Sequence, residues 1–363
     1  MAPFSRRLAV AFASALLALG LLYFAAWPVP VAPVAWEAPA NAGYTGAFET
    51  NDRLAALELL SLGDDVGPED VATDEAGRLY VSTHAGYIVR LRPDGTGPER
   101  WVHTGGRPLG LDFDAAGHLI VADASRGLLR IAPDGRTTVL ATAADGVPIS
   151  LADDVDVAAD GKIYFTDASA KFGGTTWGTA EASVLDIVEH GGHGRLLVHD
   201  PATGATTTVR DGLQFANGVA VGHDQTYVLV SETGSYRVLR VWIAGARRGA
   251  AEPFIESLPG FPDNISAGRD GRYWIALYAP RNLLLDRLSA RPFLRKVLLR
   301  VPAVIRPRAT AYGHIIAVDT AGRVVADLQD PTGRYPMNTS VHETATHLYV
   351  GSLVAPGLGR LRK

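Results

Sequence analysis

The sequence predicts an all-β fold, a six-bladed β-propeller, on three observations. A strand–turn–strand–turn–strand pattern fills residues 67–95 and recurs almost residue for residue in 107–135. Further copies fall at 151–169, 215–243, 260–277 and 337–353. The 39 glycines and 22 prolines gather mostly at the turns, as short antiparallel strands require. Repeats of about 40–50 residues that each form a small antiparallel sheet are typical of a propeller, whereas a two-sheet sandwich does not explain such regular self-similarity.

The N-terminal segment predicts a membrane anchor. Residues 8–27 carry no charge, and a run of this length, at about 1.5 Å per residue, just spans a hydrocarbon core about 30 Å thick. Arg6 and Arg7 before the run, with Tyr23 and Trp27 near its far end, favour a cytoplasmic N-terminus and an interfacial aromatic belt. We therefore expect a membrane-anchored protein whose propeller lies on the non-cytoplasmic side, which is periplasmic, luminal or extracellular.

A cleaved signal peptide is the alternative, because Ala25 and Ala26 are small enough for a cleavage site. A retained signal-anchor is favoured, since the apolar run exceeds a signal core of about 7–15 residues and Trp27 and Pro28 make a poor cleavage context. Either outcome exports the rest of the chain.

The predicted domain organisation has three parts. Residues 1–28 form the signal-anchor or transmembrane segment, 29–50 a Pro-rich spacer that lifts the body off the bilayer, and 51–363 the propeller. An insertion at 280–307 predicts helix interrupted by prolines, rich in leucine and arginine, with Asp286 as its only acid. It fits a membrane-surface helix or a lid over the channel mouth, and equally a helix packed on the propeller with a solvated basic face.

Composition excludes several classes of function. The chain has no cysteine, so disulfides, thiolate chemistry and Cys-based metal sites are ruled out. Its formal charge of −4, with 20% charged residues, shows no basic excess of the kind that binds nucleic acid. We therefore expect a small-molecule substrate and the membrane as partners, and no nucleic acid.

Oxygen-bearing side chains recur where each first strand begins. The first strand of a propeller blade lines the central channel, so residues at its start converge on one axis. The residues at this position are, blade by blade, Glu69, Pro108 and Leu109, Asp153, Asn217, Asp263 with Asn264, and Thr339 with Ser340. A single Asp or Asn at this position, such as Asp153 or Asn217, is read as a turn residue bonded to its own backbone.

Their coincidence at one repeat phase predicts a metal site instead. Carboxylates aimed at one axis repel each other strongly without a cation. Calcium takes about 6–8 such oxygens at about 2.3–2.6 Å, and magnesium tolerates irregular cages less well. The expected cofactor is Ca²⁺, and the expected ligands are Glu69, Asp153, Asn217, Asp263 and Asn264.

At these residues the chain resembles the strictosidine synthase-like proteins, relatives of gluconolactonases, paraoxonases and diisopropyl fluorophosphatase. The resemblance covers about residues 55–363 and is densest in 194–221 and 258–277. The anchored arrangement is similar to the adipocyte plasma membrane-associated protein branch. In the hydrolase relatives, a Glu, two Asn or Asp residues and an Asp or Asp-Asn pair hold a catalytic calcium. The resemblance places that pattern on the five ligands named above, with Asp153 where Asn is more usual.

Two departures from the family narrow the expected chemistry. Thr339 stands where plant strictosidine synthases have the glutamate of their Pictet–Spengler condensation, so that condensation is not expected here. Leu109 stands where paraoxonases have a histidine. The resemblance then implies calcium-dependent hydrolysis of lactones or aryl esters. Asp263 is the first choice of catalytic base and Asp153 the second, although both could be pure metal ligands.

Further residues are predicted near the pocket. His84, Asp167, Glu232 and Tyr278 each follow a second strand, which returns to the same mouth. Thr339 stands at the first position of the sixth blade, and His342 lies just beyond it. Each could instead be a turn cap or a solvated loop residue. The alternative function is a non-catalytic propeller that calcium stiffens and that binds a partner, favoured by the residues at 109 and 339.

Overall fold

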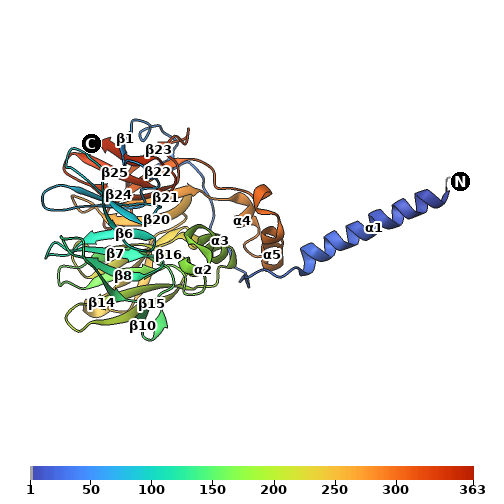
Figure 1. The fold of residues 1–363 in the computed structure, drawn as a ribbon, viewed down its shortest axis with the longest axis horizontal. Coiled ribbons are helices and arrows are strands. Elements are labelled where there is room, and N and C mark those ends of the chain that lie inside the picture. The colour runs from blue at the N-terminus through green and yellow to red at the C-terminus, as the bar shows by residue number, and fades with distance from the viewer. Residues whose placement is uncertain (1–2) are drawn as a thin grey trace.

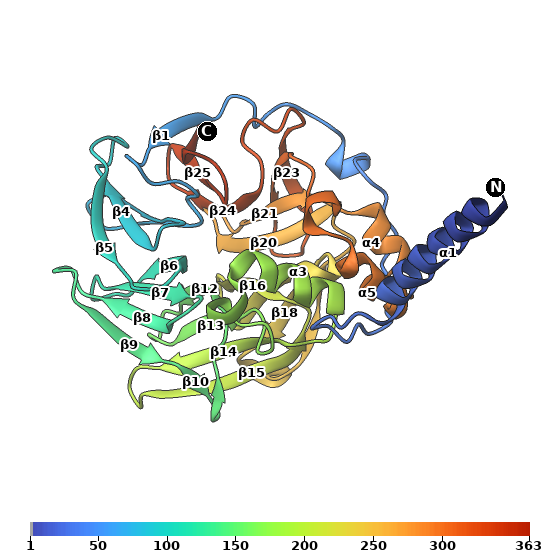
Figure 2. The same ribbon diagram turned by 45° about the vertical axis from the view of Figure 1, so that its right-hand side comes forward.

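The computed structural model describes residues 3–363 and contains six four-stranded antiparallel sheets set around one centre (Figures 1 and 2). The prediction of a six-bladed β-propeller is confirmed. The first blade consists of β2 (Val71–Thr73), β3 (Leu79–Ser82), β4 (Tyr87–Leu91) and β5 (Glu99–His103). The second consists of β6 (Pro108–Phe113), β7 (Leu119–Asp123), β8 (Gly127–Ile131) and β9 (Thr137–Ala141). The third consists of β12 (Ala152–Val157), β13 (Ile163–Asp167), β14 (Gly194–Asp200) and β15 (Ala205–Leu213). The next two are β16 (Ala216–Val221), β17 (Tyr227–Glu232), β18 (Arg237–Trp242) and β19 (Ala251–Ile255), then β20 (Gly260–Ala267), β21 (Tyr273–Pro280), β22 (Gly313–Val318) and β23 (Val324–Asp330). A small hairpin, β10 (Ala143–Ala144) and β11 (Val147–Pro148), stands outside the blades.

The sixth blade closes the ring with both ends of the domain. Its strands β24 (Asn338–Glu343), β25 (His347–Ser352) and β26 (Gly357–Arg362) come from the C-terminus, and β1 (Glu58–Ser61) pairs antiparallel with β26. This N-terminal strand was absent from the repeat copies seen in the sequence. The pairing ties the two ends of the propeller together and covers an edge that would otherwise be open.

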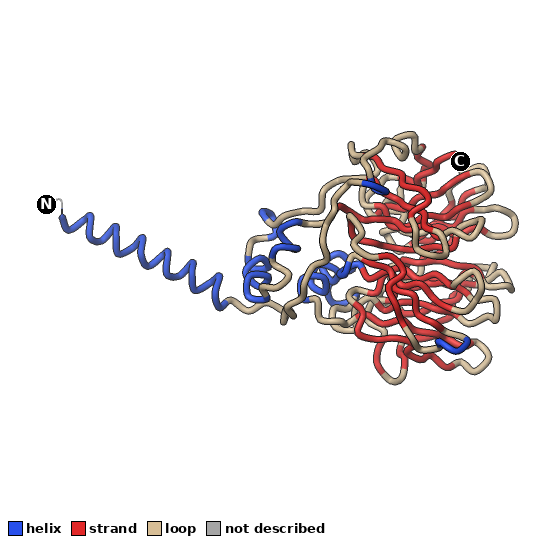
Figure 3. The backbone as a smooth tube through the Cα atoms, turned by 180° about the vertical axis from the view of Figure 1, so that it is seen from behind, coloured by secondary structure: helices blue, strands red, loops and turns tan. Residues whose placement is uncertain are grey.

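The α-helices gather on one face of the propeller (Figure 3). The helices α2 (Gly174–Trp177) and α3 (Thr179–Glu189) are inserted in the third blade, a feature the sequence reading missed. The helices α4 (Leu283–Arg287) and α5 (Pro292–Arg300), with the short η4 (Ala303–Ile305), are inserted in the fifth blade. We call residues 280–310, which contain α4, α5 and η4, the cap.

An apolar helix, α1 (Pro3–Ala26), projects from the same face (Figures 1 and 3). Its residues 7–26, apolar apart from Arg7, form a stretch long enough to cross a membrane, and no residue of this stretch is buried. The segment after it lies against the helices: the Val34 N–H donates to the Glu189 carbonyl at 2.8 Å, and the Trp36 N–H to the Ser289 carbonyl at 3.2 Å.

Glycine allows neighbouring first strands to approach closely. A Cβ on Gly218 would lie 2.4 Å from the Ile265 nitrogen and 2.5 Å from the Asn264 Cα. A Cβ on Gly110 would likewise lie 2.6 Å from the Asp154 Cα. Both contacts are with backbone atoms, so a methyl group at either position must push two blades apart at the channel.

We expect Gly218→Ala to destabilise the propeller by roughly 1–3 kcal/mol, the usual cost of overpacking a close contact. A denaturation midpoint measured on the purified full chain tests this. Gly20→Ala is the control, since no atom lies within 4 Å of its Cβ position. Equal midpoints for the two variants would contradict the close approach of blades four and five.

Candidate functional site

A β-bulge at the start of the first strand recurs in five of the blades. In β12, the pairs Ala152↔Asp167 and Val155↔Phe165 enclose three steps along β12 but only two along β13. The same shift occurs in β6, β16, β20 and β24. A bulge adds one residue to one strand and re-aims side chains. The bulged residues are Leu109 and Gly110, Asp153 and Asp154, Asn217 and Gly218, Asp263 and Asn264, and Thr339 and Ser340.

A cavity of about 550 Å³ opens at this end of the channel. Of the predicted metal ligands, it is lined by Glu69, Asp153, Asn217 and Asp263. Asn264 is not part of its wall, but the Asn264 Nδ2 donates to Glu69 Oε1 at 3.1 Å. The structure therefore brings the five residues from four blades together around one end of the axis.

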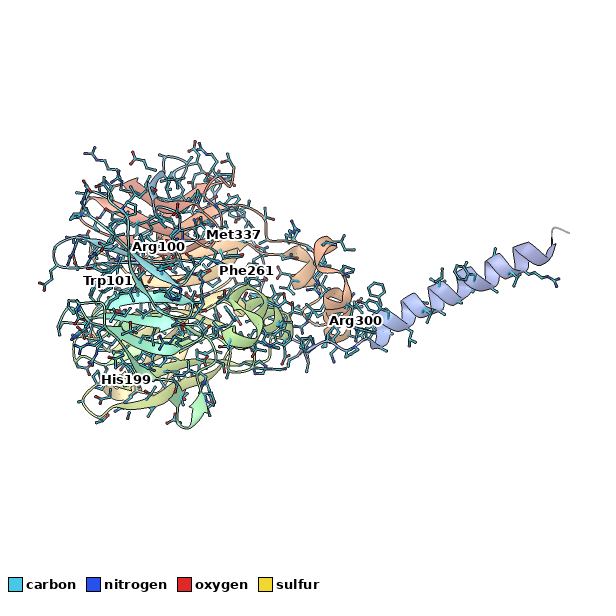
Figure 4. The ribbon with its side chains drawn as sticks, viewed as in Figure 1. Arg100, Trp101, His199, Phe261, Arg300 and Met337 are labelled. Carbon is cyan, nitrogen blue, oxygen red and sulfur yellow. The ribbon has the colours of Figure 1, made fainter. Side chains whose placement is uncertain are left out.

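Apolar side chains form most of the remaining wall, and the cap and α3 form its roof. The propeller contributes Leu151, Phe215, Phe261, Tyr278 and Met337. Figure 4 shows Phe261 and Met337 on the side of the propeller that faces the cap. Sequence reasoning missed most of this wall, because a buried aromatic residue before a strand resembles any other core residue.

Three buried oxygens in the acidic cluster lack partners. Glu69 Oε2, Asn217 Oδ1 and Asn264 Oδ1 have no hydrogen-bond partner among residues 3–363. These side chains are 2%, 5% and 3% exposed. A buried acceptor left unpaired costs about 1–3 kcal/mol, so three of them at one place form a site suited to a cation.

Burial, with repulsion between neighbouring carboxylates, raises the pKa of the acidic groups. Burial, followed by the charges of Asp70, Asp153 and Asp263, holds the pKa of Glu69 well above its usual value. Burial and the Asp153 charge do the same to the pKa of Asp263. Burial raises the pKa of Asp153 to about 7. Without a cation, the cluster therefore keeps protons that ordinary carboxyls lose near pH 4.

The carboxylates do not form a metal cage by themselves. Within the described part of the chain, no three His, Asp or Glu side chains are placed so that they could hold an ion. The donor set at the channel mouth combines three carboxylates with the amides of Asn217 and Asn264, so the unpaired amide oxygens carry the case for a cation.

Two acidic residues beside the predicted ligands connect the blades. Asp70 Oδ2 accepts from the Leu111 N–H at 2.8 Å, and Asp154 Oδ2 accepts from the Val219 N–H at 2.8 Å. Each bond joins one blade to the first strand of the next. Sequence reasoning missed both residues, although the doublets Glu69-Asp70 and Asp153-Asp154 parallel the Asp263-Asn264 doublet that it did single out.

Arg107, just before β6, is a further residue that sequence reasoning missed. Its side chain is buried, and its three guanidinium nitrogens have no hydrogen-bond partner among residues 3–363. The Arg107 charge opposes the rise in the pKa of both Glu69 and Asp153.

The predicted pocket residues separate into two groups. Tyr278 and Thr339 line the cavity. The Thr339 hydroxyl donates to the Glu69 carbonyl at 2.6 Å, and the Tyr278 hydroxyl to Met337 Sδ at 3.4 Å. His84, in contrast, is exposed outside this wall.

Asp167, Glu232 and His342 also lie outside the wall, for local reasons. Asp167 ends β13, accepts from the Leu151 N–H at 2.8 Å and pairs with Arg195 at 2.6 Å. Glu232 ends β17 and accepts from the Gln214 N–H at 2.9 Å. Both serve as caps at a strand end. His342 lies further along β24, with its Nε2 2.9 Å from the Thr73 hydroxyl, because the strand carries it away from the mouth.

The fold and the site together define a six-bladed propeller with a buried set of oxygen donors at one end of its channel. The strictosidine synthase family model matches residues 153–246, and the strictosidine synthase-like N-terminal model matches 46–91. The adipocyte plasma membrane-associated protein of Bos taurus is 34% identical over 366 aligned positions, which cover 95% of this chain and 87% of that protein. Protein strictosidine synthase-like 7 of Arabidopsis thaliana is 36% identical, over 85% of this chain and 82% of that protein. The chain belongs to the strictosidine synthase-like family.

Solved structures share the fold at low identity. A gluconolactonase from Xanthomonas campestris has a TM-score of 0.62 and 19% identity, over 92% of this chain and 96% of that chain. Regucalcin from Agrobacterium tumefaciens, described as a calcium-binding protein, has a TM-score of 0.59 and 16% identity, over 85% of this chain and 93% of that chain. At such identities the likeness concerns the propeller architecture alone.

The raised pKa of Asp153 predicts how the stability of the metal-free protein depends on pH. Folded protein binds more protons than unfolded protein between the unfolded pKa near 4 and the folded value of about 7. Unfolding free energy should therefore fall as pH rises through this window, by up to roughly 1.4 kcal/mol per pH unit.

Unfolding in the presence of a chelator, measured from pH 5 to 8, tests this prediction. Asp153→Asn should flatten the slope and be the more stable protein at the alkaline end. The control Asp211→Asn, an exposed residue of β15, should keep the wild-type slope. An unchanged slope in Asp153→Asn would contradict the protonated cluster.

Proposed function

We propose that this protein is a calcium-dependent hydrolase of lactones or aryl esters. One observation carries the proposal: a buried cluster of carboxylates and amides with unpaired oxygens forms the base of a largely apolar cavity. Such a cavity accepts an uncharged ester or lactone, while its polar base can act on the carbonyl group.

Glu69, Asp153, Asn217, Asp263 and Asn264 would hold the ion. Their donors are all hard oxygens, the type that calcium prefers over nitrogen or sulfur. When bound, calcium supplies Lewis-acid polarisation of an ester carbonyl. The three unpaired oxygens of Glu69, Asn217 and Asn264 support this assignment.

Asp263 is proposed as the general base. Its carboxylate lines the cavity and takes the proton of a water molecule while the water oxygen bonds to the carbonyl carbon. The bond from that carbon to the leaving oxygen then breaks, and the proton passes to the leaving oxygen. Asp153 is the second candidate. The apolar side chains of Leu151, Phe215 and Phe261 would hold the acyl or aryl group and limit access of bulk water.

Condensation of an amine with an aldehyde is not proposed. Thr339 points its hydroxyl at the Glu69 carbonyl and carries no group that accepts a proton at neutral pH. Leu109 presents an apolar side chain to the same cavity. The same two residues favour the second candidate function, a propeller that calcium only stiffens and whose face binds a partner.

The apolar α1 and the plasma membrane-associated relative support membrane association. We propose that residues 1–28 are retained as a signal-anchor and that the propeller of residues 51–363 lies on the non-cytoplasmic side. Immunodetection of the mature N-terminus would test retention directly.

Turnover of phenyl acetate and of a lactone panel tests the hydrolase proposal. We expect activity that a chelator abolishes and that Ca²⁺ restores. Asp263→Asn should reduce kcat/KM by about 10²–10⁴-fold, the usual contribution of a general base. Asp270→Asn, in an exposed turn, is the matched control and should retain activity. Absence of turnover in calcium-loaded, folded protein would favour the scaffold.

Calcium binding is tested separately from turnover. Saturation at about 100 times the dissociation constant should stabilise the fold by about 2.7 kcal/mol, because the ion binds only the folded site. Asn217→Ala should remove most of the thermal shift, whereas Asn41→Ala, in an exposed segment, should keep it. A full calcium shift in Asn217→Ala would place the ion elsewhere.

A further inference from the structure

The cap exposes a group of large apolar side chains. Leu283 is 59% exposed and Phe293 55%, and Val304 and Ile305 are 78% and 70% exposed. Leu284 and Leu294, at 40% and 37%, lie on the same short helices. A group of exposed apolar side chains on one small element of a folded protein indicates a surface that contacts a membrane or a partner protein.

The same element carries exposed cations. Arg287, Arg291 and Arg308 are exposed. The only acid of α4 and α5, Asp286, is engaged internally, at 3.1 Å from Arg281 and in a hydrogen bond of 2.8 Å from the Tyr236 hydroxyl. The exposed side chains of the cap that lie outside the cavity wall are therefore both apolar and basic: Leu283, Phe293, Val304 and Ile305 with Arg287 and Arg291. This combination suits anionic lipid headgroups above an acyl layer.

The position of α1 identifies the lipid surface that the cap can reach. Arg300 of α5 donates from Nε to the Trp27 carbonyl at 2.6 Å and from Nη1 to the Phe24 carbonyl at 2.7 Å. The Tyr23 hydroxyl donates to the Arg300 carbonyl at 2.9 Å. Figure 4 shows Arg300 where the cap meets α1. When α1 spans a bilayer, these contacts hold α5 at the level of the headgroups.

We propose that the cap docks on the bilayer that α1 spans and that the cavity takes its ligand from the lipid phase. Leu284 and Arg306 belong to the cap and also line the cavity, so the roof of the cavity and the docking face are the same element. The ligand class is an amphiphile with an acyl or aryl chain and a carbonyl head. This last step rests on the proposed hydrolase function; the docking itself does not.

A lipid quenching experiment on the full chain in nanodiscs tests the docking. Because the chain has no cysteine, Ile305→Cys can carry a single environment-sensitive fluorophore. Val325→Cys, on β23 of the propeller and 55% exposed, is the matched control. Spin-labelled lipid should quench most of the emission at 305 and little at 325, and more so with anionic lipid.

Equal and weak quenching at the two positions would overturn the docking. So would protection of the 305 label that persists in detergent and increases with protein concentration, since that outcome assigns the face to a second copy of the chain. Neither result depends on turnover, so failure of the docking and failure of the hydrolase proposal are distinguishable.

Entry from the lipid phase has its own test. The double variant Phe293→Asp with Ile305→Asp changes two exposed side chains outside the cavity wall. Turnover of a long-chain lactone dissolved in vesicles should fall about tenfold, while turnover of water-soluble phenyl acetate should stay unchanged. An equal loss on both substrates, or no loss on either, would overturn entry from the lipid.

Discussion

The β-bulge at the start of the first strands is the constraint on which the site depends. In a regular strand, successive side chains point to opposite faces, so Asp153 and Asp154 could not both serve the channel end. The extra residue in β12 lets both carboxylates lie near the channel end, where Asp153 lines the cavity and Asp154 Oδ2 accepts from the Val219 N–H of the next blade. Because the bulge recurs in five blades, oxygen-bearing side chains from separate strands form one cluster.

That cluster is held by bonds that do not involve its own unpaired atoms. The Thr339 and Ser340 hydroxyls both donate to the Glu69 carbonyl, at 2.6 and 2.9 Å. The Thr166 hydroxyl donates to the Asn217 carbonyl at 2.6 Å. Backbone positions are thereby fixed between blades while side-chain oxygens stay available. A site fixed in this way loses little freedom when it takes up an ion or a transition state, which is the condition for effective electrostatic stabilisation.

Repeat phase explains what the sequence could predict. Glu69, Asp153, Asn217 and Asp263 occupy one position of the repeat. Their convergence on the channel axis could therefore be predicted once the propeller was inferred. The repeat phase does not reveal which side-chain oxygens already accept a hydrogen bond. Asp167 and Glu232 accept from backbone N–H groups of their own blades, and both lie outside the cavity wall. β1 was missed for another reason: a four-residue strand far from its partner β26 has no local signal.

The links between the N-terminal segment, the cap and the cavity are made largely through backbone carbonyls. The fully buried Arg295 donates to the carbonyls of Val34, Val188 and Ser289, which belong to the N-terminal segment, α3 and the cap. One guanidinium thus joins the three pieces that cover the cavity. Every residue has a backbone carbonyl, so these three contacts require Arg295 but place little demand on the sequence of the segments that it joins. The roof of the cavity is therefore bonded both to the segment that follows α1 and to α3, so a bilayer crossed by α1 would also set the orientation of the cavity.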